Sequence, residues 1–370
     1  MVRIAVVGLR FGASFVPIYQ RHPDVEAVAV CDLDPERRNA AGDKHDVPTE
    51  RRLESLDAVL ASDAWDAVHL ATPVPLHVEQ AVAALRAGKH VASAVPAGTT
   101  LDGLRQLVTT QRETGRSYMM METAVYTREF LYVRDLYARG ELGRIQLLRG
   151  AHYQDMDGWP SYWAGLPPMH YATHALGPLL HLTGGRATSV TCLGSGSMRS
   201  ELHAQYGNPY PVETATFTLA GPGVESVAAE VTRSLFETAV AFKESFDVYG
   251  DRATFLWQQV PGDEPALIRL GDLPADQPNP RRQVTVERPK IPYRPDLLPA
   301  PLAQFAGGGH GGSHPHLVHE FIRSIVERRA PAVDVTRAAN WTAAGLCAHE
   351  SAKRGGERVT IPTSADLVGT

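Results

Sequence analysis

The chain has 370 residues, of which 44% are hydrophobic and 21% charged, and its formal net charge is −5. This length is enough for two domains with separate cores. The mild negative charge gives no electrostatic basis for binding nucleic acid or an anionic membrane. No apolar run is long enough to cross a bilayer, and the first predicted strand leaves no room for a signal peptide, so we expect a cytoplasmic protein.

Cysteine and histidine spacing predicts neither disulfides nor a metal site. The three cysteines are widely scattered: Cys31, Cys192 and Cys347. They form no close pairs, which argues against a disulfide framework and a zinc knuckle. One group of histidines also lacks the spacing of a zinc site: His310, His314, His316 and His319. We therefore expect no bound metal.

The first 32 residues have the order of a dinucleotide-binding βαβ unit. Residues 4–7 form a short apolar run that suits a buried strand, and Gly8 ends it. Residues 12–20 can form a helix, and residues 25–30 form a second apolar run that leads to Asp32. Backbone N–H groups at such a helix start attract a pyrophosphate, and the carboxylate can accept hydrogen bonds from the adenine ribose.

This segment departs from the common G-x-G-x-x-G pattern. Gly8 is present, but Arg10 holds the second glycine position and Ala13 the third. Arg10 either obstructs the approach of the backbone to the phosphates or caps the pyrophosphate with its charge. A doubly wound domain that binds no nucleotide is the alternative interpretation of this motif.

The acid that follows the second strand favours NAD over NADP, because a carboxylate repels a 2′-phosphate. That acid is Asp32. Arg37 and Arg38 lie close enough in sequence to weaken the preference.

Strand and helix signals alternate through the first part of the chain. The expected strands are 67–71, 90–93 and 117–121, and the expected helices are 77–87 and 101–114. This alternation predicts an α/β Rossmann domain over residues 1–123, with a parallel sheet covered by helices on both faces.

Strand signals follow one another in the rest of the chain. After a predicted helix at 127–139, the strand-like segments are 145–153, 189–194, 214–219, 224–233, 241–249 and 253–259. We expect residues 124–370 to form an α+β domain with a large, mostly antiparallel open sheet. Two further helices are expected at 315–328 and 336–352, after a long loop rich in proline and glycine at 261–312.

Several separate motifs resemble the Gfo/Idh/MocA oxidoreductase family. They are the βαβ unit, A-T-P at 71–73 with His77, G-K-H-V at 88–91 and G-G-E-R-V-T-I-P at 355–362. The resemblance implies a Rossmann domain followed by a domain whose open sheet serves substrate and subunit contacts. It therefore implies a homodimer or homotetramer with a small carbohydrate substrate.

The resemblance and the βαβ unit together define an expected NAD site. Its residues are Gly8, Arg10, Phe11, Gly12, Asp32, Thr72, Pro73, His77, Ala94, Pro96 and Glu122. The family motif E-K-P normally supplies a lysine beside the nicotinamide. This chain has Ala94-Val95-Pro96 there, so no side chain can titrate at that position.

A second signature occupies residues 166–185. His170 replaces an aspartate of the family pattern, and His174 takes the place of its histidine. The form Y-x-T-H-x-L-G-P, together with G-H-G-G at 309–312, is similar to the NAD-dependent glycosidase branch, typified by α-N-acetylgalactosaminidases. The resemblance implies that Tyr171, His174 and His310 are catalytic.

Tyr171 and His174 are three residues apart at a predicted helix start, so they project from one face. If that face meets the nicotinamide, a sugar C3–H can pass hydride to NAD⁺ while His174 takes the hydroxyl proton. The ketone acidifies C2–H, which an ionised Tyr171 could remove. Elimination, addition of water and return of the hydride then give net hydrolysis.

Two other functions stay open. A simple NAD-dependent sugar or cyclic-polyol dehydrogenase would stop after the first step. A non-catalytic NAD- or sugar-binding regulator is consistent with the departures at Arg10 and Val95.

Polar and aromatic residues near these motifs are candidates for substrate binding: Tyr126, Tyr153, Asp155, Trp159, Trp163 and His170. Tryptophan rings can stack on the apolar face of a sugar, although they equally suit a core or a subunit interface. Lys243 alternates with Phe242 and Glu244, and this pattern does not decide which side chain faces the pocket.

Overall fold

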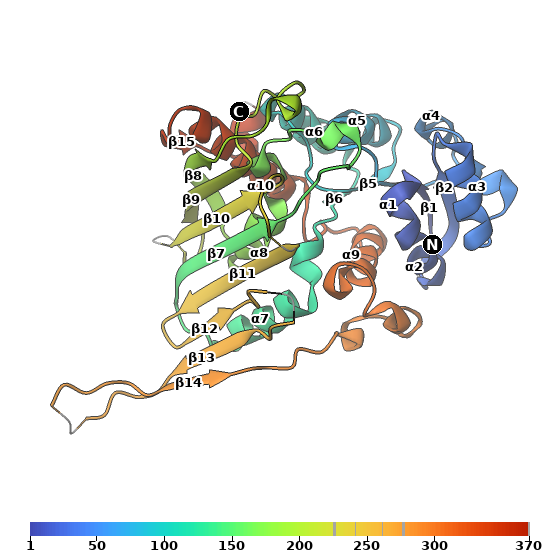
Figure 1. Cartoon of the computed structure of the whole chain (residues 1–370). Coiled ribbons are helices and arrows are strands. Elements are labelled where there is room, and N and C mark those ends of the chain that lie inside the picture. Colours follow the sequence, from blue (N-terminus) through green and yellow to red (C-terminus); the bar gives the residue numbers. More distant parts are fainter. Residues whose placement is uncertain (225–226, 241, 261, 276–277, 369–370) are drawn as a thin grey trace. The chain divides into compact units, whose positions relative to one another are not determined.

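The chain forms two units that are each discontinuous in sequence (Figure 1). The computed structural model describes residues 1–224, 227–240, 242–260, 262–275 and 278–368. Unit 1 comprises Met1–Thr127, Tyr293–Ala343 and Pro362–Thr370, and unit 2 comprises Arg128–Pro292 and Ala344–Ile361. The expected strands 224–233 and 241–249 and the expected loop 261–312 each include positions outside the described residues: 225, 226, 241, 261, 276 and 277.

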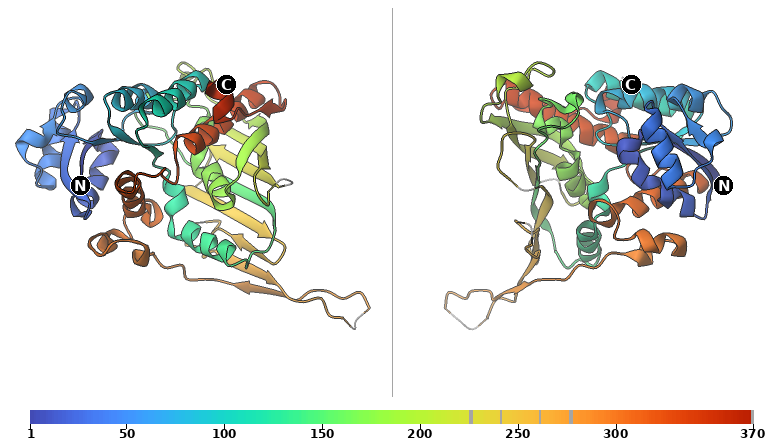
Figure 2. Two further views of the ribbon diagram at one scale, coloured as in Figure 1. Left: turned by 180° about the vertical axis from the view of Figure 1, so that it is seen from behind. Right: turned by 45° about the vertical axis from the view of Figure 1, so that its right-hand side comes forward.

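Unit 1 contains the predicted parallel sheet. Its strand order is β3-β2-β1-β4-β5-β6, and every neighbouring pair is parallel. The strands are β1 (Val2–Val7), β2 (Val25–Cys31), β3 (Arg52–Leu53), β4 (Ala67–Leu70), β5 (His90–Ser93) and β6 (Tyr118–Met120). Their apolar runs are buried because helices cover both faces (Figure 2).

Helices link these strands: α1 (Leu9–Gly12), η1 (Ala13–Phe15), α2 (Val16–Arg21), α3 (Pro35–Lys44), η2 (Thr49–Arg51), α4 (Leu56–Leu60), η3 (Val74–Leu76), α5 (His77–Arg86), α6 (Leu101–Thr114) and η4 (Thr123–Tyr126). The helix expected at 12–20 is interrupted at η1, and Pro17 then occupies the first turn of α2, where a missing N–H is tolerated. The Thr100 side chain caps α6, and Gly115 ends it with a φ of 64°.

The expected single boundary near Thr123 is wrong, because later segments return to unit 1. The helices η9 (Ala300–Phe305) and α9 (Ser313–Val326) bury Leu302 and Phe321 in the same apolar cluster as Ile4. The helix α10 (Val335–Lys353) then begins in unit 1 and ends in unit 2, and α11 (Ser364–Val368) belongs to unit 1. Apolar burial thus decides the division, and chain order does not.

Unit 2 contains a nine-stranded sheet of order β14-β13-β12-β11-β7-β10-β9-β8-β15. The strands are β7 (Ile145–Tyr153), β8 (Arg186–Ser195), β9 (Val212–Ala220), β10 (Ala228–Ser234), β11 (Lys243–Gly250), β12 (Ala253–Leu256), β13 (Ala266–Leu270), β14 (Val284–Glu287) and β15 (Val359–Thr360). Only the pair β7–β10 is parallel among the strand pairs assigned in this part of the structure. The prediction of a mostly antiparallel sheet is therefore confirmed.

The two faces of this sheet differ. The helices α7 (Arg128–Ala138) and α8 (Thr173–Thr183) lie on one face (Figure 1). Gly150 of β7 allows α8 to come close, because a Cβ atom there would lie 2.2 Å from the Ala175 carbonyl oxygen. The opposite face exposes a row of hydroxyl side chains from β9: Thr214, Thr216 and Thr218.

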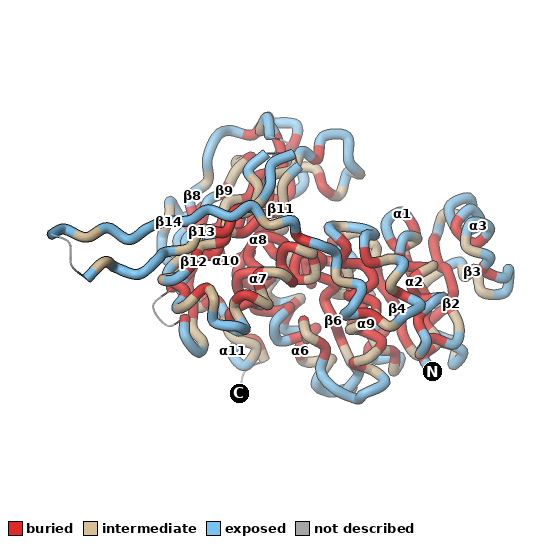
Figure 3. Tube along the Cα trace, turned by 90° about the horizontal axis from the view of Figure 1, so that it is seen from below, coloured by how far each residue is buried: buried red, intermediate tan, exposed pale blue. Residues whose placement is uncertain are grey.

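The long loop expected at 261–312 is wrong in part. It contains the hairpin β13–β14, of which β14 is exposed and β13 is partly buried (Figure 3), followed by η8 (Pro295–Leu297), η9 and η10 (His310–Gly312). β13 is five residues long and β14 four, and the proline, glycine and charged residues around them obscure the strand pattern in the sequence. In the described part of the chain, no helix has both the length and the apolar character needed to cross a membrane.

We predict that Gly150→Ala lowers the free energy of unfolding by about 1–3 kcal/mol, because the added methyl group forces α8 away from β7. Urea unfolding measures this change. The control is Gln146→Ala at an exposed position of the same strand, which should change the free energy of unfolding by less than about 0.5 kcal/mol. Equal stability of the Gly150→Ala variant and the parent would contradict the packing argument.

Candidate functional site

The glycine turn lies at the carboxyl end of β1. Gly8 has a φ of 87°, and a Cβ atom there would lie 2.5 Å from the Ala71 carbonyl oxygen, so only glycine fits. Its N–H donates to the Cys31 carbonyl over 2.9 Å. Gly12 is buried, whereas Arg10 is exposed. The turn therefore presents backbone and one cationic side chain at the edge of the sheet where ligands of such folds bind.

Asp32 stabilises this turn as well as offering a carboxylate. Its Oδ2 accepts a hydrogen bond from the Leu9 N–H over 2.8 Å. The Arg37 Nη1 atom lies 3.1 Å from Oδ1, and the Arg38 Nη1 atom donates to the Asp32 carbonyl over 2.8 Å. Both arginines thus contact the acid, as their places in the sequence suggested, and they reduce the local negative potential that would reject a 2′-phosphate.

His77 joins two other loops at this end of the sheet. Its Nε2 lies 2.9 Å from the Thr72 carbonyl oxygen, and its Nδ1 lies 2.8 Å from that of Pro96. Burial lowers the pKa of His77, against the opposite effect of the two carbonyls. The residue is only 1% exposed, so its expected role in the cofactor site is to hold in place the loops that carry Thr72 and Pro96. Pro73 and Ala94 lie half-buried on the same two loops.

Phe11 and His310 lie together in unit 1. Their ring centroids are 6.0 Å apart, and the Phe11 ring is 40% exposed. His314 lies beneath them and stacks on Phe15 at 4.1 Å. Gly309 has a φ of 57°, and a Cβ atom there would overlap the His314 ring, which explains part of the glycine run. His310 is therefore placed beside the glycine turn.

Glu122 and Tyr126 follow the last strand of the parallel sheet. Glu122 is fully buried, and its Oε1 accepts a hydrogen bond from the Ala124 N–H over 3.0 Å at the start of η4. The Tyr126 ring lies parallel to that of His316, with centroids 6.3 Å apart. Both residues thus lie at the carboxyl edge of the sheet, where the hydrogen bond of Glu122 stabilises the start of η4.

Tyr171 and His174 meet in unit 2. Tyr171 ends η6 (Pro168–Tyr171), and His174 is the second residue of α8. The Tyr171 Oη atom lies 3.1 Å from His174 Nε2, within hydrogen-bond distance. His174 is 4% exposed, and Tyr171 is half-buried. A phenol and an imidazole in contact can exchange a proton, so this pair is suited to acid–base chemistry.

Three further residues surround the pair, and the sequence did not single them out as site residues. Glu244 Oε1 lies 3.9 Å from His174 Nε2 and 3.7 Å from His152 Nε2. The fully buried Arg233 donates from Nε to the Tyr171 carbonyl over 3.0 Å, and its guanidinium carbon lies 5.1 Å from the centre of the Tyr171 ring. Strand alternation gave a signal for Glu244, but only the register with β7 decides its face.

The tryptophans differ in what they can offer a sugar. The Trp163 ring packs against that of Tyr171, with centroids 5.0 Å apart. Trp163 is only 7% exposed, so it stabilises Tyr171 and has little surface to offer a sugar. Trp159 lies edge-on to Trp163, 6.0 Å away, and is 47% exposed. Among the aromatics expected to stack on substrate, Trp159 has the open face.

Tyr153 is on the wrong face of the sheet for the expected substrate role. It is adjacent to His152 on β7, and successive side chains of a strand point to opposite faces. Its partner in register is Lys243, whose Nζ donates to the Gln259 side chain over 2.9 Å. Asp155 is exposed and accepts a hydrogen bond from the Asp157 N–H over 3.0 Å, which places it in a surface turn.

His170 belongs to a second buried cluster. Its ring lies edge-on to that of His349, 5.0 Å away, and burial lowers the pKa of His170 to about 3. His349 Nδ1 in turn lies 2.6 Å from Glu213 Oε1, and Glu213 Oε2 accepts a hydrogen bond from the Met169 N–H over 2.8 Å. This arrangement ties η6 to α10 and gives His170 a packing contact there.

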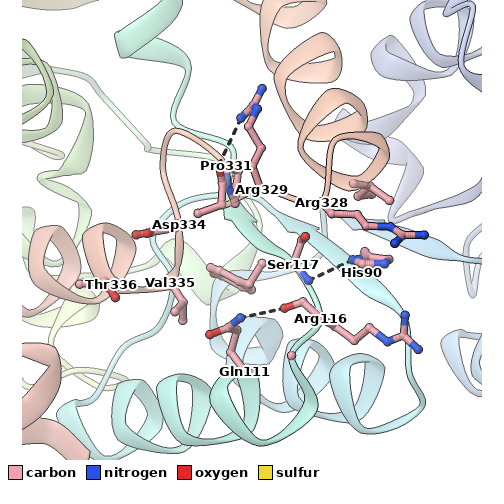
Figure 4. A pocket seen from close by; sticks show the side chains of 14 residues that line it. His90, Gln111, Arg116, Ser117, Arg328, Arg329, Pro331, Asp334, Val335 and Thr336 are labelled. Atoms are coloured by element: carbon pink, nitrogen blue, oxygen red, sulfur yellow. Dashed lines mark hydrogen bonds between the residues drawn. The ribbon is translucent and has the colours of Figure 1, made fainter.

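A cavity of about 680 Å³ lies at the opposite edge of the parallel sheet, at the amino ends of β5 and β6 (Figure 4). Its lining includes His90, Arg116, Arg328 and Asp334, and it contains none of the expected cofactor or substrate residues. In the described residues, no group of three or more histidine, cysteine, aspartate or glutamate side chains is placed to hold a metal ion.

Comparisons with known proteins agree with these two units. The family model described as an oxidoreductase family with an NAD-binding Rossmann fold matches residues 2–122, and the GFO/IDH/MocA C-terminal domain matches residues 130–256. A glycosyl hydrolase family 109 protein of Saccharopolyspora erythraea is 26% identical, over 98% of this chain and 83% of its own length.

Solved structures share the fold. A levoglucosan dehydrogenase in complex with NADH and levoglucosan has a TM-score of 0.76 and 18% identity, covering 98% of this chain and 99% of that chain. An oxidoreductase from Agrobacterium radiobacter, in complex with NAD⁺, L-tartaric acid and magnesium, has a TM-score of 0.74 and 17% identity, covering 97% and 98%.

The residues of unit 1 fit the cofactor that the family model names. Gly8 lets the turn after β1 pack against the backbone of Ala71 and Thr72, and Asp32 places a carboxylate at the end of β2. The predicted family, fold class and cofactor are thereby confirmed. The chain belongs to the Gfo/Idh/MocA family of NAD-dependent oxidoreductases.

Proposed function

We propose that this enzyme cleaves glycosides by transient oxidation at C3 of the sugar, elimination, addition of water and re-reduction. The observation that carries the proposal is the contact between Tyr171 and His174, 3.1 Å apart. The similarity to a protein named for glycosyl hydrolase family 109 supports it. The substrate is a small carbohydrate glycoside.

The two residues divide the proton transfers. NAD⁺, when bound, supplies a reversible hydride acceptor for the sugar carbon. His174 takes the proton of the C3 hydroxyl as that carbon is oxidised, and an imidazole suits this because its ordinary pKa is close to neutral pH. Tyr171 removes the proton from C2, which the new ketone has made acidic. The charge of Arg233, 5.1 Å from the ring, favours the ionised phenol that this step requires.

The number of bases distinguishes this proposal from the alternative. A sugar or cyclic-polyol dehydrogenase needs one proton acceptor beside the oxidised hydroxyl, whereas elimination needs a second acceptor at the neighbouring carbon. Tyr171 is that second group, and Trp163 and Arg233 both hold it in place. A dehydrogenase is the second candidate function, because a solved structure of similar fold is that of a levoglucosan dehydrogenase with bound levoglucosan.

His310, the third proposed catalytic residue, lies on the glycine-rich turn of η10 in unit 1. It lies beside Phe11, one of the residues expected to bind NAD. The family's usual lysine is replaced, because Ala94 and Val95 stand where the family usually has an acid and a lysine.

We predict different failures for the two catalytic variants. His174→Ala should slow oxidation by at least roughly 100-fold, because the hydroxyl proton loses its acceptor. Tyr171→Phe should still allow oxidation but stop elimination, so NADH should accumulate on the enzyme without release of the leaving group. A stopped-flow record of absorbance at 340 nm, with phenol release from aryl glycosides, measures both steps.

Tyr162→Phe is the matched control, because that tyrosine lies on the same aromatic segment but contacts Trp163 and not His174. It should retain turnover. Full turnover of Tyr171→Phe with stoichiometric oxidation of free sugar would refute the glycosidase proposal and establish the dehydrogenase.

We predict that the enzyme prefers NADH to NADPH and that Asp32→Asn reduces this preference roughly ten-fold. The amide keeps an acceptor for the Leu9 N–H while it removes the charge. Fluorescence titration with both cofactors measures the ratio. Asp43→Asn, at an exposed ion pair with Arg52, is the control, and a parent that binds NADPH more tightly would contradict the prediction.

We also propose a homodimer or homotetramer built on the exposed face of the unit 2 sheet, since one face of a large antiparallel sheet commonly needs cover. Thr216→Arg, in the middle of the exposed threonine row, should shift the protein toward monomers in light scattering. Arg144→Ala, at an exposed ion pair outside that row, should leave the mass unchanged. A parent that is monomeric at micromolar concentration would contradict this arrangement.

A further inference from the structure

Charges of alternating sign surround the Tyr171–His174 pair. Arg233 lies beside the Tyr171 ring, His174 Nε2 lies 3.1 Å from the Tyr171 hydroxyl, and Glu244 Oε1 lies 3.9 Å from the same Nε2 atom. The four residues come from β10, η6, α8 and β11, so four separate elements of unit 2 converge at this place. The cation beside the phenol favours the ionised form of Tyr171, and the anion beside the imidazole stabilises His174 once it has accepted a proton.

The position of Glu244 is fixed by the sheet. It lies opposite His152 in the register between β11 and β7, on the face that α8 covers. Gly150, two residues before His152 and on the same face, lets α8 come within contact distance of the strand. The Glu244 side chain is 11% exposed, so solvent screens its interaction with His174 only weakly.

We propose that Glu244 stabilises the protonated form of His174 and is therefore a positioning residue for the proposed oxidation step. This inference rests on the proposed function. When the C3 hydroxyl loses its proton, that proton binds the His174 imidazole, and the hydrogen on C3 leaves with its electron pair as a hydride for the nicotinamide cofactor, so a ketone forms. The Glu244 carboxylate stays ionised and receives no proton; it interacts with the imidazolium that has formed.

The neighbouring groups set the size of the effect. An opposite charge within about 4–6 Å shifts a titration midpoint by roughly one to three pH units. Three neighbours also affect the midpoint of His174. His152 lies 3.7 Å from the same carboxylate and competes for it, and the positive charge of Arg233 disfavours a second cation nearby. The ionisation of Tyr171, in contact with His174, changes the local charge as well. We therefore expect the lower end of this range, about one pH unit.

The test is a nuclear magnetic resonance titration of the histidine imidazoles in the full-length protein without substrate. The His174 signal is assigned by its loss in His174→Asn, and the His152 signal by its loss in His152→Asn. In Glu244→Gln, the midpoint of His174 should fall by about one pH unit. In Glu244→Asp, which keeps the charge on a shorter side chain, the midpoint should lie between those of Glu244→Gln and the parent.

Glu230→Gln is the matched control. Glu230 lies on β10, pairs with Arg149 at 3.1 Å and belongs to the exposed face of the same sheet, so its removal should not move the His174 midpoint. An unchanged or raised His174 midpoint in Glu244→Gln would overturn the inference. A change confined to His152 would overturn it as well, because the carboxylate would then serve the other histidine.

This outcome is separable from that of the proposed function. The titration needs no turnover, so it tests Glu244 even if the reaction is a simple dehydrogenation. Conversely, full turnover of His174→Ala would refute the proposed proton acceptor whatever the titration shows. With an active glycoside in hand, Glu244→Gln should also move the acid limb of the pH–rate profile to lower pH by the same amount as the His174 midpoint.

Discussion

The close approach of α8 to β7 at Gly150 is the constraint on which the chemistry of unit 2 depends. A strand with a side chain at this position would hold the helix further away, because the Ala175 carbonyl occupies the space. His174 is one residue before Ala175, so the same contact brings its imidazole down to the sheet. Glu244 and His152 can then lie within 4 Å of one another across β11 and β7, with Nε2 of His174 beside them. The close packing of the α8 backbone on the β7 backbone thus sets the distances from Glu244 to His174 and His152.

Much of the fold follows from local signals, and the site follows from them only in part. The helix α6 and the strand β7 have the predicted bounds, because a threonine cap and a terminal glycine delimit the first and regular alternation delimits the second. Tyr171 and His174 could be paired from their spacing alone. The face of the sheet to which Glu244 points could not be predicted. Alternation along a strand separates two sets of side chains but does not say which set faces the helices, and the register with β7 depends on residues distant in sequence.

Long-range packing explains the other differences. The return of α9 to unit 1 depends on an apolar cluster that joins distant parts of the chain, such as Phe321 and Ile4, and no local pattern reports this. The hairpin β13–β14 escapes prediction because its strands are short and flanked by proline and glycine. Tyr153 shows the same limit at the level of one residue: it is adjacent to His152 in sequence, yet the pleat of the strand carries it to the other face.

The absence of a titrating residue at Ala94 and Val95 changes where acid–base chemistry can reside in this fold. A single lysine at that turn would provide one proton acceptor in the unit that holds the cofactor. Here the proposed proton acceptors are Tyr171 and His174, which belong to unit 2 and lie 3.1 Å apart. Two adjacent acceptors, one beside a cation and the other beside an anion, suit the proposed reaction, in which one proton comes from a sugar hydroxyl and the next from the neighbouring carbon. A lysine cannot do this, because one nitrogen must release its first proton before it can accept another.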